Sequence, residues 1–327
     1  MSSLSRALIL FAAVAATAVL PLRDAQASPA EKLQEVTVTA NRARLASRVR
    51  KFVNKIVTPE NNGEDGIARW QAPPVCPLVS GLTERQGEFI LERLSDIARE
   101  AGVPLAGEHC RPNLYVLVTS QPKELLRAME KRNRPFTFGY DTFGDNGVAN
   151  STETPESVVN TFIETPRAVR VWYNAKETDP WGRPFGICQG AQLLAECLAN
   201  PVRHPICSPN VHFQCSRGVA AGSHITLSAM TMFSRVFVVV DRTRMHGVSL
   251  GQLAAYVAMV GFAKLKPGAD LRDAPTILRL FGGAPGAAPA GLTNWDQAFL
   301  KSLYATNRLV TGQSGPIARS MVRDIAH

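Results

Sequence analysis

The sequence predicts an α+β fold, a mixed sheet with packed helices. Strand-like and helix-like segments follow one another without the regular alternation of a doubly wound parallel sheet. A strongly β-branched run closes residues 224–241, and a nearly apolar segment with helical length follows at 249–262. With 327 residues the chain can bury a sizeable core in one large domain or two.

The elements of the main domain are expected from residue 69 onward. Helix 83–102 has the clearest boundaries, with Thr83 as N-cap, Gln86 as its capping-box partner and Gly102 at the end. The region 133–165 is rich in Gly, Asn, Thr and Asp and predicts a long loop. The other expected elements are a strand within 69–82, strand 113–120, helix 121–132, strand 168–174, one or two strands in 224–241, helix 249–262, a short helix or turn at 274–281 and helix 292–307.

Residues 1–27 have the pattern of a secretory signal. Arg6 supplies the basic region, an apolar run follows, and Ala25-Gln26-Ala27 forms an A-x-A cleavage site. The apolar run is shorter than the about 20 residues of a transmembrane helix. We therefore expect a signal peptide at 1–27, an extended arm (28–40) and basic helix within 28–66, a main domain at 67–310 and a C-terminal tail at 311–327, in a periplasmic or secreted protein.

The charge balance is moderately basic, with a formal net charge of +9. Outside the cytoplasm the acidic partners are lipid head groups, lipopolysaccharide or acidic polymers, so we expect no nucleic-acid partner. Residues 42–57 combine apolar residues at helical spacing with Arg and Lys. They predict a basic helix that either contacts a membrane peripherally or docks by its apolar face with its charges in water.

Six cysteines in an exported chain indicate disulfides. Cys76 and Cys110 flank one predicted strand–helix unit, and we expect them to pair. The other four lie in a Cys-rich insertion, residues 186–216, and are expected to pair among themselves: Cys188, Cys197, Cys207 and Cys215.

The segment "GICQGAQLLAE", residues 186–196, resembles the nucleophile elbow of class I glutamine amidotransferases. The resemblance puts Cys188 at the nucleophile position, where a helix N-terminus would lower the thiol pKa. No buried strand precedes Cys188, however, and the chain has no H-P-E partner motif. A thiol hydrolase or amidotransferase using Cys188 is therefore an alternative function.

A second alternative is a zinc-binding module in "HPICSPNVHFQC". Two His and two Cys at short spacing could close a tetrahedral zinc site formed by His204, Cys207, His212 and Cys215. The spacing matches no common zinc finger, and exported cysteines more often form disulfides. We expect no cofactor and no metal, with this cluster as the alternative.

From residue 69 the order of segments resembles a metzincin-like catalytic domain. "RVFVVVD" stands where that family has the strand before its active-site helix, and "AAYVAMVGF" (254–262) where it has H-E-x-x-H-x-x-G. "APTILRLF" lies near the Met-turn position, and "LTNWDQAFLKSLY" resembles the closing helix. The resemblance implies a zincin-like fold, with Gly261 allowing the chain to turn after the helix.

The zinc ligands of that family are missing here. Its two histidine positions are Ala254 and Ala258, its glutamate is Ala255 and its third ligand is Lys264. Alanine binds no zinc, and without zinc and the glutamate no water is activated. His246 lies outside this register. The sequence therefore predicts a zincin-shaped domain without catalysis, or alternatively an unrelated α+β fold with a buried Ala/Val helix.

The segment "LQEVTVTANR", residues 33–42, resembles the TonB box of TonB-dependent outer-membrane receptors. TonB boxes add an extended strand to the edge of a partner sheet. The partner-contacting residues implied are Glu35, Val36, Thr37, Val38 and Thr39. Three interpretations stay open: binding to TonB, docking on a receptor or partner sheet, or adding an edge strand to the protein's own domain.

Overall fold

The computed structural model describes residues 29–57, 67–138, 156–178, 230–266, 268–282 and 288–326. The chain divides into two compact units, residues 1–41 and 42–327. The second unit has the predicted α+β fold, with a mixed four-stranded sheet and helices packed on it.

The sheet consists of β1 (Pro77–Ser80), β2 (Leu114–Thr119), β3 (Val169–Thr178) and β4 (Met230–Asp241). Their order across the sheet is β1-β2-β4-β3. Strands β1, β2 and β4 run parallel to one another, and β3 pairs with β4 in the antiparallel direction. The β-branched run is thus a single long strand, β4, in the interior of the sheet, where both its faces can be covered.

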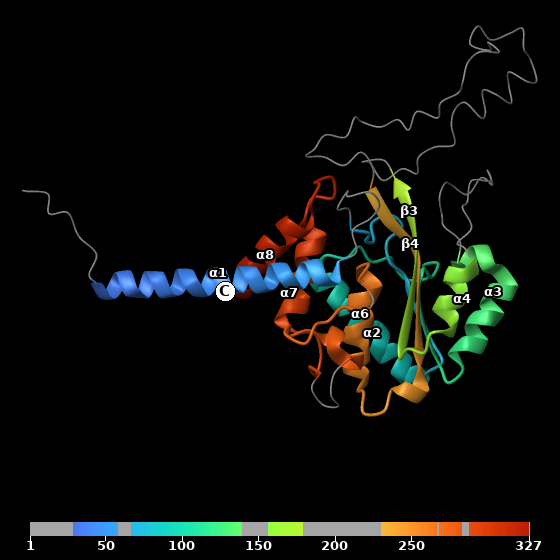
Figure 1. Ribbon diagram of the computed structural model, residues 1–327. Helices are drawn as coiled ribbons and strands as arrows, with labels where there is room; N and C mark the ends of the chain where they lie inside the picture. Colours follow the sequence, from blue (N-terminus) through green and yellow to red (C-terminus); the bar gives the residue numbers. More distant parts are fainter. Residues whose placement is uncertain are drawn as a thin grey trace, which may run out of the picture. The chain divides into compact units, whose positions relative to one another are not determined.

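Helices cover both faces of the sheet (Figure 1). On one face lie α3 (Pro122–Phe138) and α4 (Glu156–Glu164), whose Leu126, Val159 and Ile163 pack with Val239 of β4. The other face carries α2 (Glu84–Ala101), α6 (Leu250–Phe262), α7 (Asn294–Ala305) and α8 (Ser314–Ala326). We call these the α3/α4 face and the α6 face.

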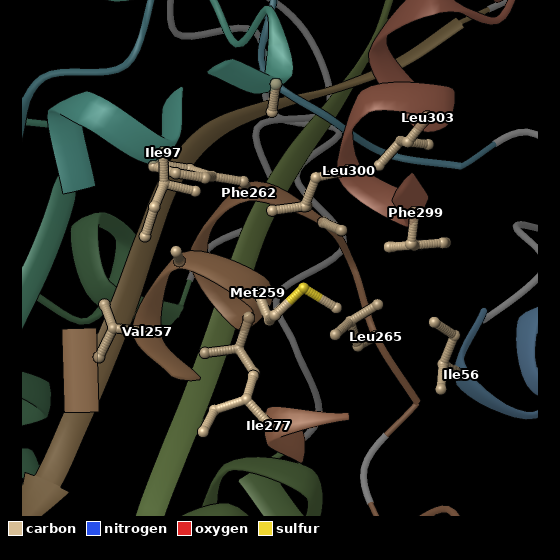
Figure 2. Packing of buried hydrophobic residues seen from close by; sticks show 14 of the residues in the cluster. Ile56, Ile97, Val257, Met259, Phe262, Leu265, Ile277, Phe299, Leu300 and Leu303 are labelled. Carbon is tan, nitrogen blue, oxygen red and sulfur yellow. The ribbon is translucent and has the colours of Figure 1, made fainter. Parts of the chain in front are cut away.

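The main core lies on the α6 face, with α6 in its middle (Figure 2). Val257, Met259 and Phe262 of α6 are buried, and Phe299 and Leu300 of α7 belong to the same buried cluster. A helix surrounded by protein on nearly all sides must be apolar all round, which accounts for the composition of residues 249–262.

Helix α1 (Pro29–Ile56) differs from the prediction for the N-terminal arm. Residues 28–40 were expected to be extended, and this expectation is wrong for the backbone from Pro29 onward, which is helical. The period-2 pattern of Glu35–Thr39 is outweighed because these residues continue directly into the helical sequence of 42–56. Extending an existing helix needs no new nucleus, so local β-propensity is readily overridden.

The second half of α1 docks on the protein by its apolar face. Val49, Val53 and Phe52 are buried, and the Phe52 ring lies 5.4 Å from the Trp295 ring and 6.4 Å from the Phe299 ring. The exposed Lys55 donates a hydrogen bond to the Asp270 carbonyl at 2.9 Å. Of the two interpretations of residues 42–57, the structure therefore has the one in which the helix docks by its apolar face on the core.

Two further segments differ from the prediction. Residues 156–164 of the expected loop form α4, and residues 314–326 of the expected tail form α8. Both are amphipathic and bury residues at helical spacing, among them Ile317 and Met321 of α8. Among the residues that the structure describes, no helix is long and apolar enough to cross a membrane.

Candidate functional site

Helix α6 contains the residues that the sequence analysis compared with the catalytic helix of zincins. It begins with a capping box, in which the Ser249 hydroxyl accepts from the Gln252 N–H at 3.1 Å and Gln252 Oε1 accepts from the Ser249 N–H at 3.0 Å. The cap satisfies N–H groups that have no partner inside the helix. The predicted boundaries of this helix are confirmed.

The alanines of α6 face the core rather than a cleft. Ala254 and Ala258 are 0% exposed and Ala255 is 3% exposed. A catalytic zinc needs ligands and an open coordination position, and these three side chains offer neither. Lys264 follows the helix, where its backbone N–H donates to the Ala68 carbonyl at 3.4 Å, and His246 is exposed between β4 and α6.

Gly261 has another role than the one the resemblance implies. It lies inside α6 instead of in a turn after it. A Cβ built there would stand 3.2 Å from Cδ1 of Leu114, which is fully buried on β2. The carbonyl of Gly261 also accepts a hydrogen bond from Trp70 Nε1 at 2.7 Å. The glycine therefore lets α6 approach the sheet closely.

A buried carboxylate joins two elements that follow α6. Asp296, at the start of α7, accepts hydrogen bonds from the Thr276 hydroxyl (2.5 Å), the Ile277 N–H (2.9 Å) and the Thr293 N–H and hydroxyl (3.0 and 2.9 Å). Thr276 caps the 3₁₀ helix η2 (Ile277–Phe281). Burial raises the pKa of Asp296, and the hydrogen bonds oppose this. The carboxylate accepts hydrogen bonds from backbone N–H groups at the starts of η2 and α7, and Asp296 is fully buried, so its role is structural.

A buried guanidinium has a similar structural role. Arg69 donates from Nη1 to the carbonyls of Leu303 and, at 3.3 Å, Thr306, and from Nη2 to Gln313 Oε1 at 2.6 Å. It thereby ties the end of α7 and the start of α8 to the segment before β1. Burial is the main cause that lowers the pKa of Arg69 to about 10.

A third charged group lies at the carboxyl end of β4, on the α3/α4 face. Asp241 accepts from the Thr243 N–H (3.0 Å) and hydroxyl (2.6 Å), and its other oxygen lies 3.5 Å from Arg244 Nε. Arg170 of β3 is on the same face, because it pairs in register with Val239. Its Nη1 donates to the Arg167 carbonyl at 3.3 Å. Sequence reasoning missed this group, since its members are far apart in the chain.

The cysteine predictions are tested in part. Cys76 and Cys110 form a disulfide, with their Cα atoms 6.0 Å apart, as expected. The remaining candidates fall outside the residues described: Cys188, Cys197, Cys207, Cys215, His204 and His212. Within the described ranges, no group of three His, Cys, Asp or Glu side chains could hold a metal ion. Glu35–Thr39 lie in helix α1.

Comparisons of the chain with protein-family models, with curated proteins and with solved structures found no match.

Proposed function

We propose that this chain is an exported, non-catalytic binding or accessory protein of the periplasm or outer membrane. One observation carries the proposal: Ala254, Ala255 and Ala258 are buried in the core at the positions where the resembling enzymes have their zinc ligands and glutamate. The helix is capped at its start, and its inward side chains are apolar ones that pack in the core.

The order of elements supports a zincin-like frame for this binding protein. Strand β4 leads through the 3₁₀ helix η1 (Arg242–Arg244) into α6, and η2 and the capped α7 follow. This is the order that the resemblance implies. The proposed export has two supports, the signal pattern of residues 1–27 and the Cys76–Cys110 disulfide, which suits an oxidising compartment.

The first experiment is a count of free thiols on denatured protein purified from the periplasm without reductant. Because the proposal leaves no role for a thiolate, we expect none, which corresponds to three disulfides. A free thiol at Cys188 would favour the thiol hydrolase or amidotransferase instead. Free thiols at Cys207 and Cys215, with one equivalent of bound zinc, would favour the zinc module.

A partner at the outer membrane, TonB or a receptor, is part of the proposal. Residues 33–42 supply the TonB-box-like sequence, but addition of a strand requires an extended backbone. Since the structure has Pro29–Ile56 as a helix, the segment would have to leave α1 on binding. Unwinding this part of α1 costs free energy, so the full chain should bind TonB more weakly than the free segment does.

The test compares three ligands for the periplasmic domain of TonB: the full mature chain, a peptide of residues 28–45 and a scrambled peptide of the same composition. We expect the native-order peptide to bind more tightly than the full chain, and the scrambled peptide not to bind. If neither the native-order peptide nor the chain binds, TonB is not the partner, and the segment's role is sought at a receptor.

A further inference from the structure

The guanidinium of Arg170 is buried with few partners. The residue is 2% exposed, yet within the described part of the chain its side chain makes one hydrogen bond, from Nη1 to the Arg167 carbonyl, and its Nε has no acceptor. A guanidinium has five N–H donors in a fixed fork. Burying a charge with unused donors costs free energy unless an anion approaches it.

The surroundings of Arg170 are rich in positive charge. Burial is the main cause that lowers the pKa of Arg170. Asp241 opposes this effect, Arg244 and Arg167 lower the pKa further, and Glu164 raises it slightly. Asp241 already accepts two hydrogen bonds from Thr243 and lies beside Arg244.

Glu164 is also engaged with other cations. It pairs with Lys123 at 2.8 Å and with Arg127 at 3.2 Å, both on α3. Within the described residues, the Arg170 side chain has no hydrogen bond to either carboxylate. The cations of this group outnumber the carboxylates that face them.

We propose that Arg167, Arg170 and Arg244 form a binding site for a phosphate group. The site lies at the carboxyl end of β4, and in sheets with parallel strands ligands characteristically bind at that edge. Guanidinium groups match the geometry of phosphate with paired hydrogen bonds. Arg170 would contribute from the buried floor, and Arg167 and Arg244 would close on the ligand from the exposed sides.

This site is separate from the positions that carry the proposed function. Arg170 is on the α3/α4 face of the sheet, whereas Ala254 and Ala258 pack on the α6 face. The phosphate site could therefore exist whether or not the chain is catalytic. An anionic phospholipid head group and a small soluble phosphate ester would present the same chemistry to it.

The test measures binding of inorganic phosphate to the full mature chain by calorimetry, at constant ionic strength. We expect saturable binding of one phosphate per chain. Arg244→Gln or Arg167→Gln should weaken it by about tenfold or more, because each removes a charge-assisted hydrogen bond.

Arg93→Gln is the matched control. Arg93 has a side chain 51% exposed, against 52% for Arg244, and each is three residues from a nearby Asp. The control should leave phosphate affinity unchanged. Absence of saturable binding, or equal weakening by all three variants, would overturn the proposal. If Arg170→Met folds, it should also lose phosphate binding. If it does not fold, Arg244→Gln and Arg167→Gln test the proposal by themselves.

Vesicles then distinguish the two sources of phosphate. If the site takes a lipid head group, phosphatidylglycerol vesicles should bind the chain in an Arg244-dependent manner, and phosphatidylcholine vesicles should not. If phosphate binds but neither vesicle competes for the site, the ligand is a soluble phosphate ester. Vesicle binding that Arg244→Gln and Arg93→Gln reduce equally would be unspecific charge attraction, and would contradict a lipid site.

Discussion

The hydroxyl of Thr276 donates a hydrogen bond of 2.5 Å to the carboxylate of Asp296, twenty residues further along the chain. The same carboxylate accepts backbone N–H groups from Ile277 and Thr293, so one side chain caps both η2 and α7. These donors are buried or half-buried, and without the carboxylate they would lack partners in the described structure. The contact fixes the segment after α6 to the closing helix.

Asp296→Ala should destabilise the fold by about 3 kcal/mol, because several buried donors lose their acceptor at once. Asp296→Asn keeps one acceptor oxygen and should cost less. Urea denaturation followed by circular dichroism gives both values. The exposed Asp324→Ala serves as control and should change stability by less than about 0.5 kcal/mol. Equal costs for Asp296→Ala and the control would show that the caps are satisfied without this carboxylate.

Arg69→Ala should destabilise the protein by about 3 kcal/mol, since the buried Leu303 carbonyl and Gln313 Oε1 and the half-buried Thr306 carbonyl each lose a charged donor. Gln313 accepts from the same guanidinium, so Arg69→Ala and Gln313→Ala should be non-additive in a double-mutant cycle. Denaturant titration of the four proteins measures the coupling. Additive effects would mean that the two side chains act independently. The exposed Arg319→Ala is the control for loss of charge.

Gly81→Ala should destabilise strongly, by about 3 kcal/mol or more. Gly81 follows β1 with φ of +87°, and a Cβ there would stand 1.8 Å from the Val118 carbonyl oxygen. The Val118 backbone cannot easily move away from such a Cβ, so no side chain fits at position 81. Gly87→Ala in α2 is the matched control, because nothing lies within 4 Å of its Cβ position. The control should stabilise by up to about 1 kcal/mol through helix propensity. A tolerated Gly81→Ala would contradict the close approach of β1 and β2.

Alkaline pH should unfold the chain and ionise three half-buried tyrosines in one step. Burial raises the pKa of Tyr256 to about 12 and raises the pKa of Tyr173 and Tyr304 above their usual range. The unfolded chain releases these protons near pH 10, so stability is present below about pH 10 and is lost as pH rises above it. Absorbance at 295 nm, followed together with near-UV circular dichroism, should show tyrosinate forming as tertiary structure disappears. Ionisation of these three residues before any loss of dichroism would contradict the raised pKa values.

Replacing Cys76 and Cys110 by alanine should lower stability by about 4 kcal/mol, because the disulfide closes a loop between residues 34 positions apart. Thermal melts of the oxidised wild type and the double variant would measure the loss. An unchanged melting temperature would mean that the crosslink adds nothing to the packing around β1 and β2.

The sequence by itself determined the fold class, the elements with strong local signals and one disulfide. Helices α2, α6 and α7 were predicted because caps such as Thr83 and Ser249 and apolar spacing are local properties. The strand β4 was evident because β-branched residues stood together. The pairing of Cys76 with Cys110 followed from the strand–helix unit that they flank.

Tertiary structure decided what depends on residues distant in the chain. The period-2 pattern at Glu35–Thr39 is helical because it continues α1, and residues 314–326 are helical because a partner helix buries one face. Arg170 and Asp241 lie on the same face of the sheet only because β3 and β4 pair antiparallel, an arrangement that no local pattern specifies. Charge clusters and buried carboxylates arise from such pairings, since their free energy depends on neighbours that only the folded chain brings together.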